Sequence, residues 1–348
     1  MLKEIQLFAI FLMMVALGFI SNTYFRQKSY HILNALVPNE SKLVIMDNTN
    51  GMSSSFSANT ILREGNGILF METTDRMDPP SLVLCAIESA ARVYPDRPVV
   101  FFMKGLENIN TEEDEKRARQ HFPTLSSYSN VYLFPLRMDQ LLDETPLKPW
   151  FDKVNPEKEV YWTHVSSDAC RFALMWKYGG IYMDADVISL RPIPQDHFVA
   201  AETLTYASSS VFGLSSHYQL TWQFMENFVE NYRGEIWGHQ GPGVFTRVVK
   251  KLYGMPVFNS TDDVMCGNIS YFHPQRFYPI LYPAWRSYFE VWQNLPTFND
   301  SYALHLWNFM NKEGKSMVPG SNTLVEHLYQ KQCPTTYGYI LRNEKTHL

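Results

Sequence analysis

The stretch from Ser166 to Leu190 constrains the fold more than any other part of the chain, and it reads SSDACRFALMWKYGGIYMDADVISL. Its first half has apolar residues at the spacing of one helix face, and Ser166 or Ser167 is placed to cap that helix. Gly179 and Gly180 supply the stop, because glycine readily adopts the left-handed backbone that ends helices. The apolar run after them predicts a strand. We therefore expect a helix, a tight turn and a strand in direct succession.

Two aspartates, Asp184 and Asp186, fall on the predicted strand. Because alternate strand residues point to opposite faces, both carboxylates and Tyr182 are expected to share one face. Two ionised carboxylates about 7 Å apart repel each other unless a cation lies beside them. Oxygen ligands suit Mg²⁺ or Mn²⁺, whose remaining positions bind substrate phosphates. The alternative is a solvated Asp-x-Asp at a strand end, whereas a calcium loop is excluded because Ile188 occupies its third ligand position.

Asp168 and Arg171 lie three residues apart on the preceding helix, so they share a face and can reach the same crevice. Arg171 offers a fork of donors to phosphate or sugar oxygens. The alternative is a local ion pair within the helix, which says nothing about function. The sequence leaves both interpretations open.

The preceding part of the chain predicts a parallel sheet. Strand-like runs occur at 67–72, 98–103 and 131–136, and a helical pattern over 82–93 joins the first two. This order predicts an α/β fold whose ligand crevice lies at the carboxyl ends of the strands. Thr73 sits at that edge and is a candidate contact for a bound ligand.

Two function classes lack support. The formal net charge is −5 and the basic residues are scattered, so the sequence has no electrostatic footprint of nucleic-acid binding. It also has no glycine-rich phosphate loop, which argues against dinucleotide-binding and Walker-type proteins.

The N-terminus carries an uncharged apolar run, residues 5–20, that predicts a membrane anchor. The run is shorter than the ~20 residues of an average span but suits the thin membranes of the early secretory pathway. The alternative is a cleaved signal peptide, with Ala16-Leu17-Gly18 as a cleavage site. We expect a cytoplasmic tail (1–4), a transmembrane signal-anchor (5–20), a lumenal stem (21–62) and a catalytic domain (63–348).

Glycosylation sequons and cysteines favour a lumenal location. Four N-x-S/T sequons occur, at Asn39, Asn259, Asn268 and Asn299. Four cysteines allow three pairings. Cys85 and Cys170 lie in apolar helical patterns typical of buried thiols, and no spacing indicates zinc. Cys266 and Cys333 flank the C-terminal region and are the expected bridge.

The run S-D-x-x-R followed by Y-G-G-I-Y-x-D-x-D resembles the signature of glycosyltransferase family 32, whose members carry a DXD sugar-binding motif. Longer stretches resemble the family members that transfer N-acetylglucosamine or galactose in α-1,4 linkage. They are FMETTDRMDPPSLVLCAIESAARVYPDRPVVFFMKGL, EIWGHQGPGVFTRV, YFHPQRFYPI and SYALHLWN. The resemblance covers residues 65–334 and implies a GT-A fold, with a mostly parallel sheet flanked by helices. It also implies a UDP-sugar donor, dependence on Mn²⁺ (or Mg²⁺) and retention of the α configuration.

The resemblance implies a metal site with a returning C-terminal segment. Asp184 and Asp186 would hold the metal and the diphosphate, and Asp184 would also lie near the donor ribose. His305 is the candidate for a third ligand, although a lone histidine on a strand is more often structural. Trp307 and Asn308, which follow it, would cover the bound donor.

The resemblance also implies residues that contact the sugar. Asp168 and Arg171 would hold the hydroxyls of the donor sugar, and Tyr182 would pack beside the nucleotide. Gln240, together with His239, precedes a predicted helix and is a candidate to face the reacting centre. The alternative for this pair is a capping turn before Pro242.

The activity that the resemblance implies is transfer of GlcNAc from UDP-GlcNAc to terminal β-galactose of mucin-type, core 2, O-glycans. The implied setting is the Golgi membrane, with type II topology and a lumenal catalytic domain. The CPTT ending near Cys333 is similar to the galactosyl-transferring members, so UDP-Gal and lactosylceramide form the alternative. A glycosidase and a catalytically silent glycan-binding protein are the alternatives from other classes.

Overall fold

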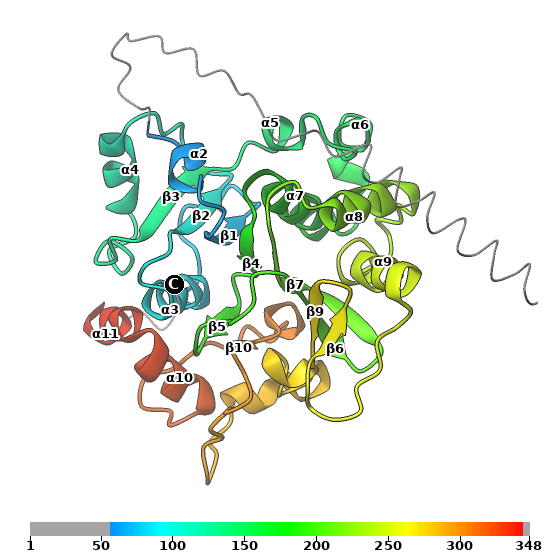
Figure 1. Cartoon of the computed structure of the whole chain (residues 1–348). Helices are drawn as coiled ribbons and strands as arrows, with labels where there is room; N and C mark the ends of the chain where they lie inside the picture. Colours follow the sequence, from blue (N-terminus) through cyan, green and yellow to red (C-terminus); the bar gives the residue numbers. More distant parts are fainter. Residues whose placement is uncertain (1–55, 344–348) are drawn as a thin grey trace, which may run out of the picture. The chain divides into compact units, whose positions relative to one another are not determined.

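The computed structural model describes residues 56–343, and its centre is one eight-stranded sheet (Figure 1). The strand order is β3-β2-β1-β4-β7-β6-β9-β8, and β5 and β10 pair separately as a two-stranded antiparallel sheet. The strands are β1 (Ile68–Glu72), β2 (Val99–Met103), β3 (Val131–Pro135), β4 (Gly180–Met183), β5 (Val187–Ser189), β6 (Phe198–Thr203), β7 (Tyr206–Leu214), β8 (Val264–Cys266), β9 (Ile269–Phe272) and β10 (Ala303–His305).

The sheet is parallel in one half and mixed in the other. Strands β3, β2, β1 and β4 are mutually parallel, as the βαβ pattern predicts. Beyond β4 the pairs β4–β7, β7–β6 and β9–β8 are antiparallel, and β6–β9 is parallel. The strand order runs from β1 through β2 to β3 on one side and continues with β4 on the other, so the carboxyl ends of β1 and β4 flank the reversal point at which α/β sheets commonly bind ligands.

Helices cover both faces of the sheet (Figure 1). Alternation along β1 shows why, since Ile68 and Phe70 enter the core beneath α3 while Leu69 and Met71 enter the core beneath α7. The helices are α2 (Ala58–Ile61), α3 (Ser81–Val93), α4 (Glu112–Arg119), α5 (Met138–Leu142), α6 (Lys148–Phe151), α7 (Trp162–Tyr178), α8 (Gln219–Glu230), α9 (Pro242–Tyr253), α10 (Leu324–Gln332) and α11 (Pro334–Asn343). Short 3-10 turns are η1 (Pro156–Lys158), η2 (Pro274–Arg276), η3 (Tyr282–Phe289) and η4 (Asn308–Met310).

The predicted α/β architecture with a mostly parallel sheet flanked by helices is confirmed. The predicted anchor at 5–20 and most of the predicted stem lie outside the described residues. Within 56–343, no helix is both long enough and apolar enough to cross a membrane. Packing begins before the expected domain boundary at 63, because Phe56 stacks on Phe134 and Leu62 is buried.

Two predictions about Ser166–Leu190 are wrong in detail. Helix α7 begins at Trp162, one turn before the expected cap, and the Ser166 hydroxyl donates to the Thr163 carbonyl inside the helix. Strand β4 ends at Met183, so Asp184 and Asp186 lie in a tight turn instead of on one strand face. Aspartate favours turns over strands, which explains the interruption. The helix does stop at Gly179, whose φ of 64° is left-handed.

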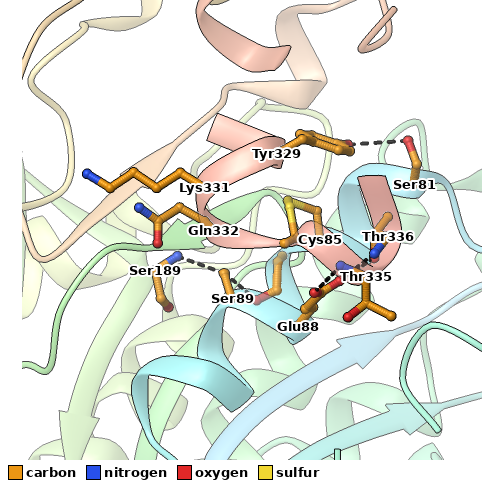
Figure 2. Close-up of a disulfide and its surroundings, with 12 residues drawn as sticks. Ser81, Cys85, Glu88, Ser89, Ser189, Tyr329, Lys331, Gln332, Thr335 and Thr336 are labelled. Carbon is orange, nitrogen blue, oxygen red and sulfur yellow. Dashed lines mark hydrogen bonds between the residues drawn. A yellow bond between two sulfur atoms is a disulfide. The ribbon is translucent and has the colours of Figure 1, made fainter. Parts of the chain in front are cut away.

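The expected Cys266–Cys333 bridge is wrong, because the disulfide joins Cys85 to Cys333 (Figure 2). Cys85 is on α3 and Cys333 lies between α10 and α11, with the two Cα atoms 5.1 Å apart. Cys266 lies on β8 at the far edge of the sheet and, like Cys170, is a buried free thiol. The sequence separation of 248 residues hides this contact, which only the docking of the C-terminal helices on α3 creates.

A buried carboxylate reinforces the disulfide (Figure 2). Glu88 is fully buried on α3 and accepts hydrogen bonds from the backbone N–H groups of Thr335 and Thr336, each at 2.8 Å. These groups form the first turn of α11, where a negative charge is favoured by the helix dipole. The hydroxyls of Tyr128 and Thr336 donate to the same carboxylate. The C-terminal helices are thus fixed to α3 by one covalent bond and one charged cap.

Removing the bridge is expected to destabilise the whole domain. For Cys85→Ser with Cys333→Ser, the free energy of unfolding should fall by about 2–5 kcal/mol, since the bridge closes a very long loop. Chemical denaturation of the full chain would measure this loss. As a matched control, replacing the free thiol Cys266 with serine should change the midpoint far less, and an equal shift in both proteins would contradict the assignment.

Candidate active site

The centre of the site is the turn between β4 and β5. The Val187 N–H donates to the Asp184 carbonyl at 3.0 Å, which closes the turn, and the Asp184 N–H donates to Ser210 of β7 at 2.8 Å. The Tyr182 hydroxyl donates to Asp184 Oδ1 at 2.7 Å. The two carboxylates therefore lie on one side, as predicted, but the turn places them there and not the alternation of a strand.

The C-terminal segment returns to this turn. Strand β10 pairs with β5, which sets His305 opposite Val187 and places its Nε2 3.4 Å from Asp186 Oδ1. The Asn308 N–H donates to Asp186 Oδ2 at 2.9 Å, and the Leu306 N–H donates to the Asp186 carbonyl. A segment more than a hundred residues away in sequence thus completes the surroundings of Asp186.

Asp184, Asp186 and His305 form a donor set that fits a divalent cation. Each offers one ligand atom, and the three atoms lie within 4.8 Å of one another. Two carboxylates and one imidazole suit Mn²⁺ or a similar ion, and three protein ligands leave positions free for substrate phosphates. The Trp307 N–H approaches His305 Nδ1 at 3.3 Å and helps to orient the ring toward Asp186.

Arg171 connects α7 to the aspartate turn. Its Nη1 lies 3.2 Å from Asp184 Oδ1 and donates to the Ser209 carbonyl at 2.8 Å, while its Nη2 lies 3.2 Å from Asp168 Oδ1. The local ion pair with Asp168 and the predicted reach into the crevice are therefore both present. Among the described residues, Arg171 is the one permanent cation that ion-pairs with Asp168 and Asp184, and Asp186 is paired with His305, so the charge of the three aspartates is under-compensated.

Burial makes the ionised carboxylates costly. It raises the pKa of Asp168 to about 7, with Arg171 opposing the rise and Asp184 adding to it. It likewise raises the pKa of Asp184, again against Arg171. The pKa of Glu202 on β6 is also raised, because burial outweighs the opposing effect of nearby His305. Positive charge brought to this crevice would therefore be favoured.

Three predicted site residues make contacts that differ from their expected roles. The Thr73 hydroxyl donates to the Thr163 carbonyl at 3.3 Å and so joins β1 to the start of α7. Trp307 is buried, and its indole N–H donates to the Ile280 carbonyl at 2.8 Å, so the ring anchors the turn instead of presenting a free face.

Gln240 is also turned inward. Its amide donates to the Phe228 carbonyl at 2.8 Å and accepts from the Arg233 N–H at 3.0 Å, and the residue is almost fully buried. Both ends of the side chain are thus satisfied by backbone groups. The structure supports the alternative interpretation, in which Gln240 fixes the turn before α9.

The sequence analysis missed Gly241, which lies against the site. A Cβ atom at this position would be 2.3 Å from Asp168 Oδ1, and its three nearest neighbours would all belong to that carboxylate. The available signal was the glycine between Gln240 and Pro242, read only as part of a capping turn. Ser209 was missed as well, because nothing local in β7 marks it as a partner of Arg171.

Adding a methyl group at Gly241 should disturb the position of Asp168. For Gly241→Ala we expect a catalytic rate about 10²-fold lower, because a displacement near 1 Å at a reacting centre has an effect of that order. Initial-rate measurements on the full chain would test this. Gly338→Ala on α11 is the control, since its new methyl group meets only the flexible end of Arg342. Unchanged activity in Gly241→Ala would show that Asp168 tolerates displacement.

Comparisons with known proteins agree with this geometry. A family model described as glycosyltransferase sugar-binding region containing DXD motif matches residues 80–205, and the α-1,4-glycosyltransferase conserved region matches residues 213–340. Human α-1,4-N-acetylglucosaminyltransferase is 52% identical over 282 residues, which cover 81% of this chain and 83% of the relative. Human lactosylceramide 4-α-galactosyltransferase is 36% identical over 274 residues, with coverage of 78% and 76%.

The solved structures are more distant. The galactosyltransferase LgtC in complex with donor and acceptor sugar analogs has a TM-score of 0.38 and 11% identity, covering 78% of this chain and 95% of that one. A likeness at this level adds nothing to the assignment. The sequence relatives, which share most of their length with this chain, decide it. The chain belongs to the DXD-containing α-1,4-glycosyltransferases, and it is a glycosyltransferase.

Proposed function

We propose that the enzyme transfers GlcNAc from UDP-GlcNAc in α-1,4 linkage, with retention, to terminal β-galactose of mucin-type, core 2, O-glycans. Identity to the N-acetylglucosaminyltransferase, at 52% over most of both chains, carries this choice of donor. The galactosyltransferase relatives stand at 36% or below. A DXD motif supports a nucleotide-sugar donor and a divalent cation, for which we propose Mn²⁺, with Mg²⁺ as the alternative.

The metal and diphosphate are held in this proposal by Asp184 and Asp186, with His305 as the third protein ligand. When bound, the ion supplies positive charge against the charge of the diphosphate leaving group. The backbone N–H of Asn308 fixes Asp186, and the buried, left-handed Trp307 holds Asn308 in place. The strain of that backbone conformation marks a position that the surrounding structure dictates.

The donor sugar lies in this proposal beside α7. Arg171 fixes Asp184 and Asp168 at once, so both carboxylates keep a defined orientation toward the sugar hydroxyls. The Tyr182 hydroxyl donates to Asp184, and the residue is fully buried. In this proposal Tyr182 therefore supports the turn and does not contact the nucleotide directly. Preorganised groups of this kind accelerate a reaction mainly by positioning and electrostatics.

The arrangement favours transfer over the two alternatives from other classes. A glycosidase places its acid and base on opposite sides of the scissile bond, whereas here Asp184 and Asp186 converge with a histidine on one point. A silent glycan-binding protein has no need for such a cluster.

We also propose a Golgi membrane location, with type II topology and the catalytic domain in the lumen. The Cys85–Cys333 disulfide supports an oxidising compartment. The sequon residues Asn259, Asn268 and Asn299 are exposed, which supports access for glycosylation. The anchor at 5–20 stays a prediction, and immunofluorescence with a Golgi marker, before and after removal of 1–20, tests it.

The donor assignment is tested with full-length protein, Mn²⁺ and methyl β-galactoside. UDP release from UDP-GlcNAc should exceed that from UDP-Gal, and the product should carry an α-1,4 linkage by NMR. Preference for UDP-Gal would move the assignment to the galactosyl-transferring relatives. Activity that survives EDTA would overturn the metal-dependent part of the proposal.

A further inference from the structure

An aromatic bridge lies beside the site, and the proposed roles do not use it. We define it as Trp237, Phe309 and His164. The rings of Trp237 and Phe309 stack with centroids 3.4 Å apart and planes 8° apart. His164 meets both of them edge-on, at 4.5 Å from Trp237 and 4.9 Å from Phe309. Three chain segments distant in sequence thus meet at one point.

Each member of the bridge is tethered to a site residue. His164 lies one helical turn before Asp168 on α7, and so on the same side of that helix. Phe309 follows Asn308, whose N–H binds Asp186. Trp237 belongs to the loop that ends at Gly241, where the chain touches the Asp168 carboxylate. The bridge therefore joins the segment that follows the metal-binding histidine to the helix and the loop that flank Asp168.

Trp237 is rigidly held and yet exposed. Phe309 covers one face, and Tyr161 and His164 contact the ring edge-on. Even so, 43% of the residue is accessible, and neighbouring Ile236 and Met310 are 39% and 37% exposed. An exposed apolar patch beside a functional crevice marks a binding surface, and a ring already fixed in place loses little entropy when a ligand binds.

The surroundings of Trp237 favour an uncharged ligand. Lys312 lies 3.6 Å from the centroid of Phe309, so it occupies the face opposite the indole. The pKa of His164 is lowered to about 4, chiefly by burial and then by Arg171 and Lys312, so its ring is neutral at physiological pH. The rings that contact Trp237 are all uncharged, and such a flat apolar surface suits the C–H face of a hexose better than a phosphate.

We propose that Trp237, backed by Phe309, is the platform on which the terminal galactose of the acceptor packs. This inference rests on the proposed function, because it takes the donor sugar to lie between the metal turn and Asp168. The acceptor hydroxyl must then approach from the solvent side, where the exposed indole lies. Trp237 is thus a specificity-determining residue for the acceptor, with no part in holding the nucleotide.

The test compares Trp237→Ala with wild type as full-length protein. The KM for methyl β-galactoside should rise at least about fivefold, the loss expected for one aromatic contact. The KM for UDP-GlcNAc and the slow hydrolysis of the donor without acceptor should stay within twofold. Trp237→Phe keeps a ring on Phe309 and should give an intermediate KM, which provides a second reading if the alanine variant folds poorly. Tyr253→Ala, which removes an aromatic ring of similar exposure at the far end of α9, is the matched control and should match wild type.

A binding measurement separates this proposal from the donor assignment. Saturation-transfer NMR of methyl β-galactoside, with UDP and Mn²⁺ present, detects the acceptor without any transfer. Loss of the signal in Trp237→Ala supports the platform even if the enzyme prefers UDP-Gal. An unchanged signal and acceptor KM, or a change confined to donor KM and donor hydrolysis, would overturn it.

Discussion

Asp186→Asn should abolish transferase activity while leaving the fold intact. The side chain contacts His305 and the Asn308 N–H at the edge of the core, and it is not itself part of the buried apolar clusters. An amide keeps the hydrogen bond from Asn308 but loses the negative charge that a divalent cation requires. We expect a rate at least about 10³-fold lower, which corresponds to roughly 4 kcal/mol of lost transition-state stabilisation.

The measurement needs a readout besides activity. Binding of Mn²⁺, followed by the EPR signal of the free ion, should weaken together with the rate, while the melting temperature stays near that of wild type. Asp139→Asn on α5 is a matched control, because this aspartate is exposed and remote from the turn. Full Mn²⁺ affinity in Asp186→Asn would remove Asp186 from the metal site.

The sequence predicted the local elements of the site better than their assembly. The strands and helices of the βαβ unit and the Gly179 stop follow from periodicity and glycine geometry, both of which are local properties. The pairing of Asp184 with Asp186 was correct although the predicted strand was not, because a turn also brings neighbouring side chains together. Local patterns therefore pointed to the two carboxylates that cluster with His305 in the structure.

Contacts between distant segments needed either a resemblance or the structure. His305 carries no local mark of a ligand, and only the resemblance pointed to it; β10 reaches Asp186 by pairing with β5. The predicted disulfide pairing was wrong for the same reason, since the docking of the C-terminal helices on α3 decides which cysteines meet. Gln240 shows the reverse error, because its motif lies near the site while its side chain is satisfied by backbone groups.

Replacement of Arg171 should be the most destabilising single change near the site. The guanidinium is buried between Asp168 and Asp184 and also binds Ser209, so Arg171→Met leaves two carboxylates without their cation. Breaking a buried pair from one side costs about 3–5 kcal/mol. We expect that loss in the free energy of unfolding at pH 8, together with loss of activity. Arg286→Met, which removes an exposed pair with Glu313, should cost about 0–1 kcal/mol.

The pH dependence distinguishes this electrostatic cause from a packing defect. The pKa of Asp168 is already raised to about 7 with Arg171 opposing the rise, so removing Arg171 raises it further. Between the unfolded and folded pKa values, the folded state binds more protons, and stability falls as pH increases. The deficit of Arg171→Met should therefore be largest above pH 7 and shrink toward pH 5. A second change, Asp168→Asn, should recover part of the stability at pH 8 without restoring activity. A deficit that is constant from pH 5 to pH 8 would instead assign the effect to lost packing, and Arg171 would then be a structural residue with no electrostatic role in the site.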